Sequence, residues 1–163
     1  MKNQGCNLHN KICIIGESGV GKSSLLSLLQ GKDMLDKRSP TVGLEIETSL
    51  LDSFGKVSIW DFGGQERFKF MWQDFLRGAG LTLLVTDSSE ENVSKSKDIY
   101  ERFSRFVGSK IIAIANKQDV PGRLTESEVQ KRLGGITTYG MSAIHPELRE
   151  KMRQILDYEI KNE

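Results

Sequence analysis

The sequence predicts an α/β protein: a doubly wound, mostly parallel six-stranded sheet with one antiparallel edge strand. Short apolar runs alternate with segments of helical periodicity, which favours this class. Several runs are almost continuously apolar, as strands covered on both faces are. One pair of runs is joined by a tight turn, which makes one strand antiparallel. In open sheets of this kind, ligands bind outside the carboxyl ends of the strands.

The first half of the chain begins with a compact apolar run over Lys11–Ile15, which we predict to be a strand. A glycine-rich segment follows it, and the leucines at 25, 26, 28 and 29 then predict a helix. Residues 44–50 alternate apolar and polar side chains, and a turn at 52–55 joins them to a second run at 56–60. This short connection predicts a hairpin at the edge of the sheet.

The second half contains two near-continuous apolar runs, 81–85 and 111–115, which predict central parallel strands. Between them, apolar residues recur at roughly helical spacing, at positions 93, 99, 103, 106 and 107, and we expect Ser88 and Glu91 to form a capping box at the start of that helix. The same signature recurs before a further predicted helix, at Thr125 and Glu128. The final helix is predicted to place on one face Leu148, Met152, Ile155, Leu156 and Ile160.

Composition limits the classes of function. The chain has 163 residues with 23 Lys and Arg against 22 Asp and Glu, so its formal charge is +1. This balance argues against a nucleic-acid binder that neutralises many phosphates. Two cysteines, Cys6 and Cys13, are too few for a disulfide scaffold or a four-ligand zinc site, and they suit a reducing cytoplasm.

Targeting and anchoring signals are not expected in this sequence. No apolar stretch approaches the 18 residues or so that a bilayer-spanning helix needs. The polar N-terminus does not read as a secretory signal, residue 2 is not the glycine of a myristoylation site, and the C-terminus is not a prenylation box. We therefore expect a cytoplasmic monomer without a direct membrane anchor, divided into a short polar extension (1–10) and one domain (11–163).

Residues 16–23, which read GESGVGKS, match the phosphate-loop pattern GxxxxGK[ST] between a predicted strand and a predicted helix. Glycines let several backbone N–H groups point at one phosphate chain, and the helix N-terminus favours the anion. Lys22 adds charge at the β- and γ-phosphate oxygens, and Ser23 offers a hydroxyl to Mg²⁺. The alternative is a glycine-rich turn without a ligand. The expected nucleotide contacts here are Glu17, Ser18, Gly19, Val20, Gly21, Lys22, Ser23 and Ser24.

Residues 116–119, which read NKQD, follow directly on the run 111–115. The Asp119 carboxylate can accept from the N1–H and the 2-amino group of guanine together, whereas adenine would leave it unpaired. An unpaired buried polar group costs about 1–3 kcal/mol, so this residue selects guanine. The Lys117 stem can lie along the base. Four polar residues after a strand are as often a simple loop, but their place after a phosphate loop favours base binding by Asn116, Lys117 and Asp119.

The chain resembles the Ras superfamily of small GTPases over essentially its whole length. The resemblance rests on GESGVGKS (16–23), Thr41, WDFGGQ (60–65), NKQD (116–119) and, more weakly, MSA (141–143). It implies a phosphate-loop G domain that binds GTP or GDP with Mg²⁺. In this family the last motif supplies a backbone N–H to the guanine O6, which would be that of Ala143, with Ser142 and Ile144 alongside. Ile144 departs from the basic residue that is commoner there.

Two loops are expected to respond to the γ-phosphate. Asp61 is suited to hold Mg²⁺ through a water, as the acidic residue after the second strand of phosphate-loop enzymes does. The resemblance implies that the Gly64 N–H meets the γ-phosphate and that Gln65 orients the attacking water. It also implies that Thr41 completes the Mg²⁺ shell only while the γ-phosphate is present, so that its loss releases both loops. Without the resemblance, this glycine-rich segment would be a flexible turn and Gln65 a surface amide.

Two residues before Thr41 depart from many relatives. Met34 stands where an aromatic ring commonly packs against the guanine, and a thioether packs more loosely there, so we hypothesise faster nucleotide exchange. Arg38 lies three residues before Thr41, the interval of the built-in catalytic arginine of heterotrimeric G-protein α subunits. An arginine that reaches the transferring phosphoryl group is worth about 10³–10⁵ in rate. The alternative, which we favour, is a solvated charge.

Features of several branches are mixed. Two glycines before Gln65, and NKQD followed by Pro121, are Arf-like, whereas the phosphate loop and residues 65–68 are Rab-like or Ras-like. The amphipathic N-terminal helix of Arf proteins and the prenylated tail of Rab and Ras proteins are both missing from the pattern, a combination similar to prokaryotic or early-branching members. The aromatic residues within 66–72 predict either an effector surface or core. His9 and His145 have no catalytic partner in the sequence.

Together, the motifs predict a small GTPase switch that binds guanine nucleotide with Mg²⁺ and hydrolyses GTP to GDP and phosphate. The alternative is a non-hydrolysing, guanine-nucleotide-bound interaction module, which would be expected to have lost Gln65, Thr41 or Ser23; all three are present. An adenine-nucleotide kinase is disfavoured because it would lack NKQD and would need an acceptor site and a lid. Effector, exchange-factor and activating proteins are the partners that the resemblance implies.

Overall fold

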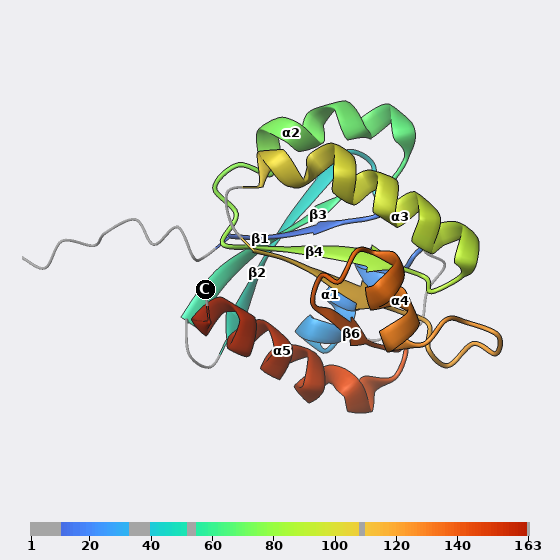
Figure 1. Ribbon diagram of the computed structural model, residues 1–163. Coiled ribbons are helices and arrows are strands. Elements are labelled where there is room, and N and C mark those ends of the chain that lie inside the picture. Colours follow the sequence, from blue (N-terminus) through green and yellow to red (C-terminus); the bar gives the residue numbers. More distant parts are fainter. Residues whose placement is uncertain (1–10, 33–39, 52–54, 108–109, 163) are drawn as a thin grey trace, which may run out of the picture.

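A computed structural model describes residues 11–32, 40–51, 55–107 and 110–162. Its six strands form one sheet in the order β2-β3-β1-β4-β5-β6 (Figure 1). β2 runs antiparallel to β3, and the other neighbours are parallel, which confirms the predicted sheet. The strands are β1 (Lys11–Ile15), β2 (Leu44–Leu51), β3 (Gly55–Phe62), β4 (Leu81–Thr86), β5 (Lys110–Ala115) and β6 (Thr138–Gly140).

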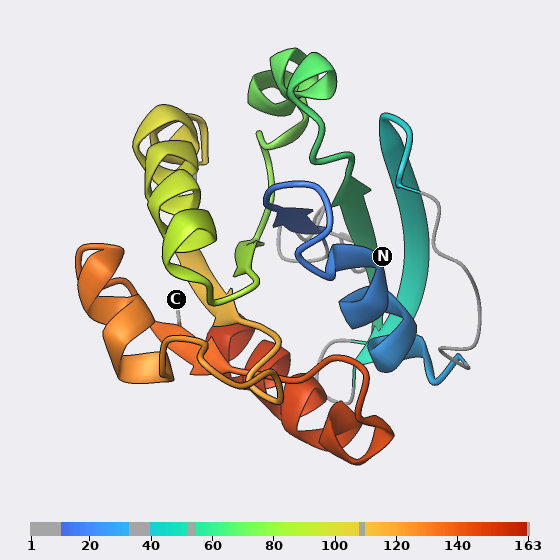
Figure 2. The ribbon, with the colours of Figure 1, turned by 90° about the vertical axis from the view of Figure 1, so that its right-hand side faces the viewer.

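Helices cover both faces of this sheet (Figures 1 and 2). Their bounds are α1 (Lys22–Gln30), α2 (Trp72–Phe75), α3 (Glu90–Phe103), α4 (Glu126–Arg132) and α5 (Arg149–Lys161), with short 3₁₀ helices at η2 (Glu66–Met71), η3 (Ser104–Phe106) and η4 (Pro146–Leu148). None of the helices in the described ranges is long and apolar enough to cross a bilayer.

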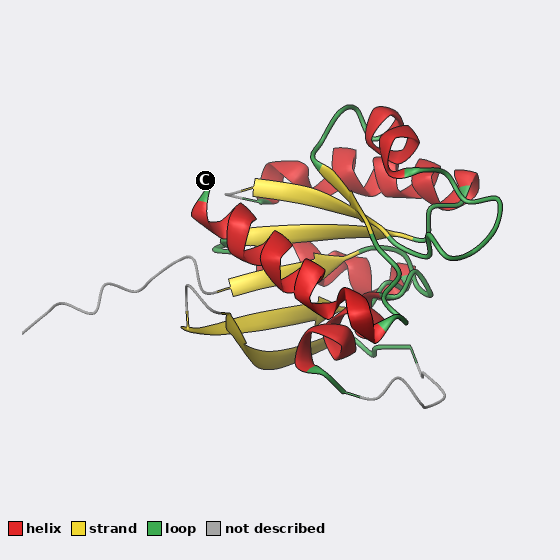
Figure 3. Ribbon diagram, turned by 90° about the horizontal axis from the view of Figure 1, so that it is seen from below, coloured by secondary structure: helices red, strands yellow, loops and turns green. Residues whose placement is uncertain are grey.

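The alternation of side chains along β1 divides the core into two layers. Ile12 and Ile14 face one side, where they join a cluster with the leucines of α1 and the apolar face of α5. Cys13 and Ile15 face the other side and pack with the apolar residues of α2 and α3. Figure 3, seen from below, shows α5 crossing the first face. These four side chains are all buried, so β1 holds the loop that follows it between two packed layers.

The start of α3 differs from the prediction. Its cap is Ser89, whose hydroxyl accepts from the Asn92 N–H at 3.2 Å, and not Ser88. Ser88 is buried in a left-handed conformation, and its hydroxyl is engaged by residues outside the helix. The α-helical part also ends at Phe103, before the apolar residues at 106 and 107 that the spacing included. The predicted capping box at Thr125 and Glu128 is confirmed at α4.

Other elements agree with the sequence more closely. The hairpin of β2 and β3 is confirmed, with Leu44 opposite Phe62 at its open end and Leu51 opposite Gly55 at the turn. Its turn residues 52–54 lie outside the described residues. The sixth strand, β6, corresponds to none of the runs that the sequence pattern predicts as strands, because three residues are too few to show a period.

Candidate functional site

The loops that follow β1, β3, β5 and β6 meet at the carboxyl ends of the strands, around an open cleft of about 380 Å³. In Figure 2 the loop that joins β1 to α1 curves near the centre of the view. The cleft is lined by residues that the sequence analysis singled out, together with Pro40: Ser18, Gly19, Gly21, Lys22, Ser23, Ser24, Thr41, Gly64, Lys117 and Ile144. Motifs far apart in the sequence therefore form one site.

The phosphate loop turns into α1 at Gly21, which has a left-handed φ of 102°. A side chain would be strained in this conformation, and a Cβ atom would also collide with the Asn116 amide. Lys22 is buried and donates to the carbonyl oxygens of Gly16 at 3.1 Å and Glu17 at 2.7 Å. Its ammonium is thereby held at the mouth of the loop that carries it.

Burial lowers the pKa of Lys22 to about 8, although the charges of Asp61 and Glu17 raise it in part. Burial removes the Lys22 ammonium from water, and the nearby negative charges stabilise its charged form only in part. An anion bound in the loop would restore the balance, which is what phosphate oxygens do in phosphate-loop proteins.

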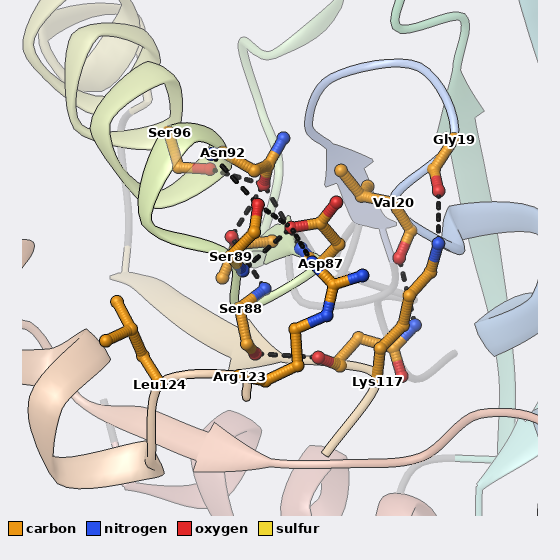
Figure 4. A network of polar contacts seen from close by, with 12 residues as sticks. Gly19, Val20, Asp87, Ser88, Ser89, Asn92, Ser96, Lys117, Arg123 and Leu124 are labelled. Carbon is orange, nitrogen blue, oxygen red and sulfur yellow. Dashed lines mark hydrogen bonds and ion pairs between the residues drawn. The ribbon is translucent and has the colours of Figure 1, made fainter. Parts of the chain in front are cut away.

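The NKQD loop is bonded directly to the phosphate loop. Asn116 donates from Nδ2 to the Val20 carbonyl at 2.9 Å and accepts at Oδ1 from the Ala143 N–H at 3.0 Å, so one buried amide joins three motifs. Lys117 donates to the Gly19 carbonyl at 2.8 Å (Figure 4). Asp119 is exposed, and its backbone N–H donates to the Ser142 hydroxyl at 3.1 Å.

Three oxygen-bearing side chains converge beside Lys22. Asp61 accepts at Oδ2 from the Ser23 hydroxyl at 2.6 Å and from the Thr41 hydroxyl at 3.3 Å, while Ser23 and Thr41 oxygens are 2.9 Å apart. The second carboxylate oxygen, Oδ1, is buried and has no hydrogen-bond partner among the described residues. Burial is the largest cause that raises the pKa of Asp61, and the Ser23 hydrogen bond opposes it.

This oxygen cluster fits a small divalent cation. A buried carboxylate with an unpartnered oxygen requires a positive charge or a donor, and hydroxyl and carboxylate oxygens are the ligands that Mg²⁺ prefers. Among the described residues, no cluster of three His, Cys, Asp or Glu side chains could hold a metal, so the candidate site depends on the two hydroxyls.

Gly64 lies directly against the phosphate loop. A Cβ atom at this position would come within 2.5 Å of three backbone atoms, in Gly16, Glu17 and Ser18. Only glycine allows this approach, which brings the backbone after β3 to the cleft. Gln65 follows it, half-buried, at the start of η2.

The segment after Gln65 is attached to the phosphate loop through a buried charge. Lys69 is 4% exposed, and its ammonium lies 2.5 Å from a Glu17 carboxylate oxygen and 3.0 Å from one of Glu66. Glu66 in turn pairs with Arg102 of α3 at 3.1 Å. The sequence around Lys69 predicts no role for it, because its partner Glu17 lies 52 residues away in the chain.

The large apolar side chains within residues 66–72 differ in burial, so some of them belong to the core and others are available for an effector surface. Trp72 is fully buried and packs on Phe103, whereas Phe70 is 71% exposed, and Phe68 and Met71 are half-buried. Met34, Arg38 and His9 lie outside the described residues. His145 pairs with Glu147, the residue two positions on.

Comparison with known proteins places the chain in a family. The sequence model of the Roc family (Ras of Complex, Roc, domain of DAPkinase) matches residues 11–119. Among curated proteins, ADP-ribosylation factor-like protein 1 of Saccharomyces cerevisiae is 31% identical over 133 residues, which cover 79% of this chain and 72% of that protein. ADP-ribosylation factor-like protein 4D of Homo sapiens is 34% identical over 130 residues, 75% of this chain and 64% of that protein.

The fold and the arrangement of motifs define a phosphate-loop α/β protein, and these matches define its class: the chain belongs to the Ras superfamily of small GTPases. Within that superfamily it is similar both to the Roc domain and to the ADP-ribosylation factor-like proteins, at about 30% identity to the latter. The sequence combines Arf-like features with Rab-like or Ras-like ones, which agrees with this low identity.

Proposed function

We propose that this chain binds guanine nucleotide with Mg²⁺ and hydrolyses GTP to GDP and phosphate. The observation that carries the proposal is that Asn116 bonds both to the phosphate loop at Val20 and to the backbone of Ala143, so the phosphate and base motifs share one cleft. Membership of the Ras superfamily supports the same activity.

In this proposal the phosphate chain lies along residues 17–24, with Lys22 on the β- and γ-phosphate oxygens. Ser23 and Thr41 hold Mg²⁺ directly and Asp61 holds it through a water, which satisfies the unpartnered Asp61 oxygen. Bound there, Mg²⁺ would neutralise charge on the phosphates. On the side of the cleft lined by Lys117 and Ile144, the base motifs bind guanine: Asp119 accepts from it, Lys117 lies along the base, and the Ala143 N–H donates to O6.

Hydrolysis requires a water in line with the bond to the γ-phosphorus atom, and phosphoryl transfer is catalysed mainly by positioning and charge. Gln65 and the Thr41 backbone orient that water, and the Gly64 N–H binds the γ-phosphate. The close approach of Gly64 to residues 16–18 supports this role, because it brings the backbone within reach of the phosphate loop. Loose packing of Met34 at the guanine edge, and Arg38 as a solvated charge rather than a built-in catalytic arginine, remain predictions.

As a switch, the chain would exchange GDP for GTP and present residues near Thr41 and Gln65 differently in the two states. Effector, exchange-factor and activating proteins are the partners we propose, with the exposed Phe70 as one contact. A monomeric, cytoplasmic protein with a single domain at 11–163 belongs to the same proposal. The alternative is a guanine-nucleotide-bound interaction module that does not hydrolyse GTP.

The test is single-turnover hydrolysis of GTP by purified protein with and without Mg²⁺, with ATP as the competing nucleotide. We expect GTP to be hydrolysed, chelation of Mg²⁺ to stop the reaction, and Gln65→Leu to slow it at least tenfold while GTP still binds. Gln73→Leu, on the exposed side of α2, is the matched control and should leave the rate unchanged. Tight binding of GTP without hydrolysis would favour the interaction module, and preference for ATP would refute the proposal.

A further inference from the structure

Two residues other than glycine have a left-handed backbone in the described ranges: Ser88, with φ 66°, and Lys117, with φ 62°. Residues with a side chain adopt this conformation rarely, and they keep it only where their surroundings determine it. Lys117 belongs to the NKQD loop. Ser88 lies between β4 and α3 and belongs to none of the family motifs described above.

Ser88 is in direct contact with the NKQD loop. Its hydroxyl donates to the Asn116 carbonyl at 2.6 Å and accepts from the Gln118 side-chain amide at 2.9 Å. A hydroxyl has one proton and a carbonyl can only accept, so these directions are determined. The second Gln118 amide proton goes to the Leu124 carbonyl at 3.0 Å. Figure 4 shows Ser88 between α3 and the loop that carries Lys117.

The backbone of Ser88 is held as firmly as its hydroxyl. Its N–H donates to the Thr86 hydroxyl at 3.2 Å, and its carbonyl accepts from the Leu124 N–H at 2.8 Å. Its side chain is fully buried. Asn92, through the Thr86 hydroxyl and the Asp87 N–H, anchors this turn to the first part of α3. All three polar groups of Ser88 are therefore bonded, which explains how its conformation is maintained.

We propose that Ser88 is a positioning residue for guanine selectivity. It holds the residues on either side of Lys117, and thereby fixes the direction of the loop that ends at Asp119. Because Asp119 is exposed and its backbone N–H is bonded to Ser142, the loop backbone determines where its carboxylate points. This inference rests on the proposed function, in which that carboxylate accepts from the guanine 2-amino group.

The test compares the dissociation constants of GDP and IDP, which lacks the 2-amino group, for nucleotide-free wild-type protein and variants. Ser88→Gly removes the hydroxyl but relieves the left-handed strain, whereas Ser88→Ala removes the hydroxyl and keeps the strain. We expect both to lower the preference for GDP over IDP by about tenfold, the effect of misplacing one hydrogen bond to a charged group. Thr82→Val removes another fully buried hydroxyl, one without a hydrogen-bond partner among the described residues, and should leave the preference unchanged.

The ratio distinguishes positioning from a structural role, because a loss of general stability would weaken GDP and IDP binding alike. Should the Ser88 variants not fold, Gln118→Met removes both amide donors at a half-buried position and should lower the same ratio. Equal weakening of both nucleotides, or an unchanged ratio in folded variants, would overturn the inference. If the wild-type protein shows no preference for GDP over IDP and ADP, the proposed function itself fails, which is a separate result.

Discussion

Replacing Gly64 with alanine should separate GTP hydrolysis from nucleotide binding. The Cβ atom of alanine would lie 2.5 Å from the Gly16 carbonyl oxygen, the Glu17 carbonyl carbon and the Ser18 nitrogen. These are backbone atoms of the phosphate loop, which cannot rotate away as a side chain would. Ordinary contact begins at 3.4 Å, so the two segments must separate by about 1 Å.

The size of the effect follows from that displacement. A misplacement of about 1 Å in a reacting arrangement costs roughly 10²-fold in rate, which corresponds to about 2.7 kcal/mol of transition-state stabilisation. The displaced groups are the Gly64 N–H and Gln65, which in the proposed function meet the γ-phosphate and the attacking water. GDP has no γ-phosphate, so its affinity should change by less than about threefold, or 0.7 kcal/mol.

The assay is single-turnover hydrolysis of bound GTP, together with the dissociation constant of GDP. Gly78→Ala is the matched control: its φ of +79° strains an alanine, but nothing lies within 4 Å of the added carbon. That variant should lose about 1 kcal/mol of stability and hydrolyse GTP at the wild-type rate. A folded Gly64→Ala protein that hydrolyses GTP within threefold of the wild-type rate would refute the reasoning.

Three further predictions follow from burial. Burial lowers the Lys22 pKa from 10.5 to about 8, so between these pH values the unfolded chain binds more protons than the folded chain. The free energy of unfolding of nucleotide-free protein should therefore rise with pH across this range, by up to about 3 kcal/mol. Urea titrations should find this rise in the wild-type protein and not in Lys22→Met. Glu159 is buried and accepts from Lys110 and the Tyr139 hydroxyl, so Glu159→Ala should lower the free energy of unfolding by about 3 kcal/mol, whereas the exposed Glu150→Ala should leave it nearly unchanged; equal effects would contradict this. Burial also raises the pKa of the Cys13 thiol to about 12, so peptide mapping should find residue 13 resistant to iodoacetamide at pH 8 until urea unfolds the protein.

Local sequence patterns are sufficient to predict an element wherever that segment alone determines its structure. The sequence predicts β1 with its bounds and predicts the glycine-rich loop between β1 and α1, because a short apolar run and a glycine pattern are both local. The antiparallel hairpin followed from the length of its turn. The convergence of the motifs also followed, since the carboxyl ends of parallel strands meet at one edge of a sheet.

The predictions from the sequence are wrong or incomplete where a contact with a residue far away in the chain determines the local structure. The capping box predicted at Ser88 is wrong by one residue: Ser89 caps α3, because the NKQD loop engages the Ser88 hydroxyl from 28 residues away. Lys69 looks like a surface charge in the sequence, yet its partner in the phosphate loop makes it a buried one. β6 exists because β5 offers it a pairing edge, which three residues cannot indicate.

The β2–β3 hairpin has a mechanical consequence. It begins just after Thr41 and ends just before Gly64, and at its open end the Gly63 N–H donates to the Gly43 carbonyl at 2.7 Å. The two segments beside the phosphate loop, at Thr41 and at Gly64, are therefore joined directly by this hairpin. Eight paired positions hold its register, so neither end can slide along the other without breaking the ladder. A displacement of β2, one of the two edge strands of the described sheet, would therefore be transmitted to both loops.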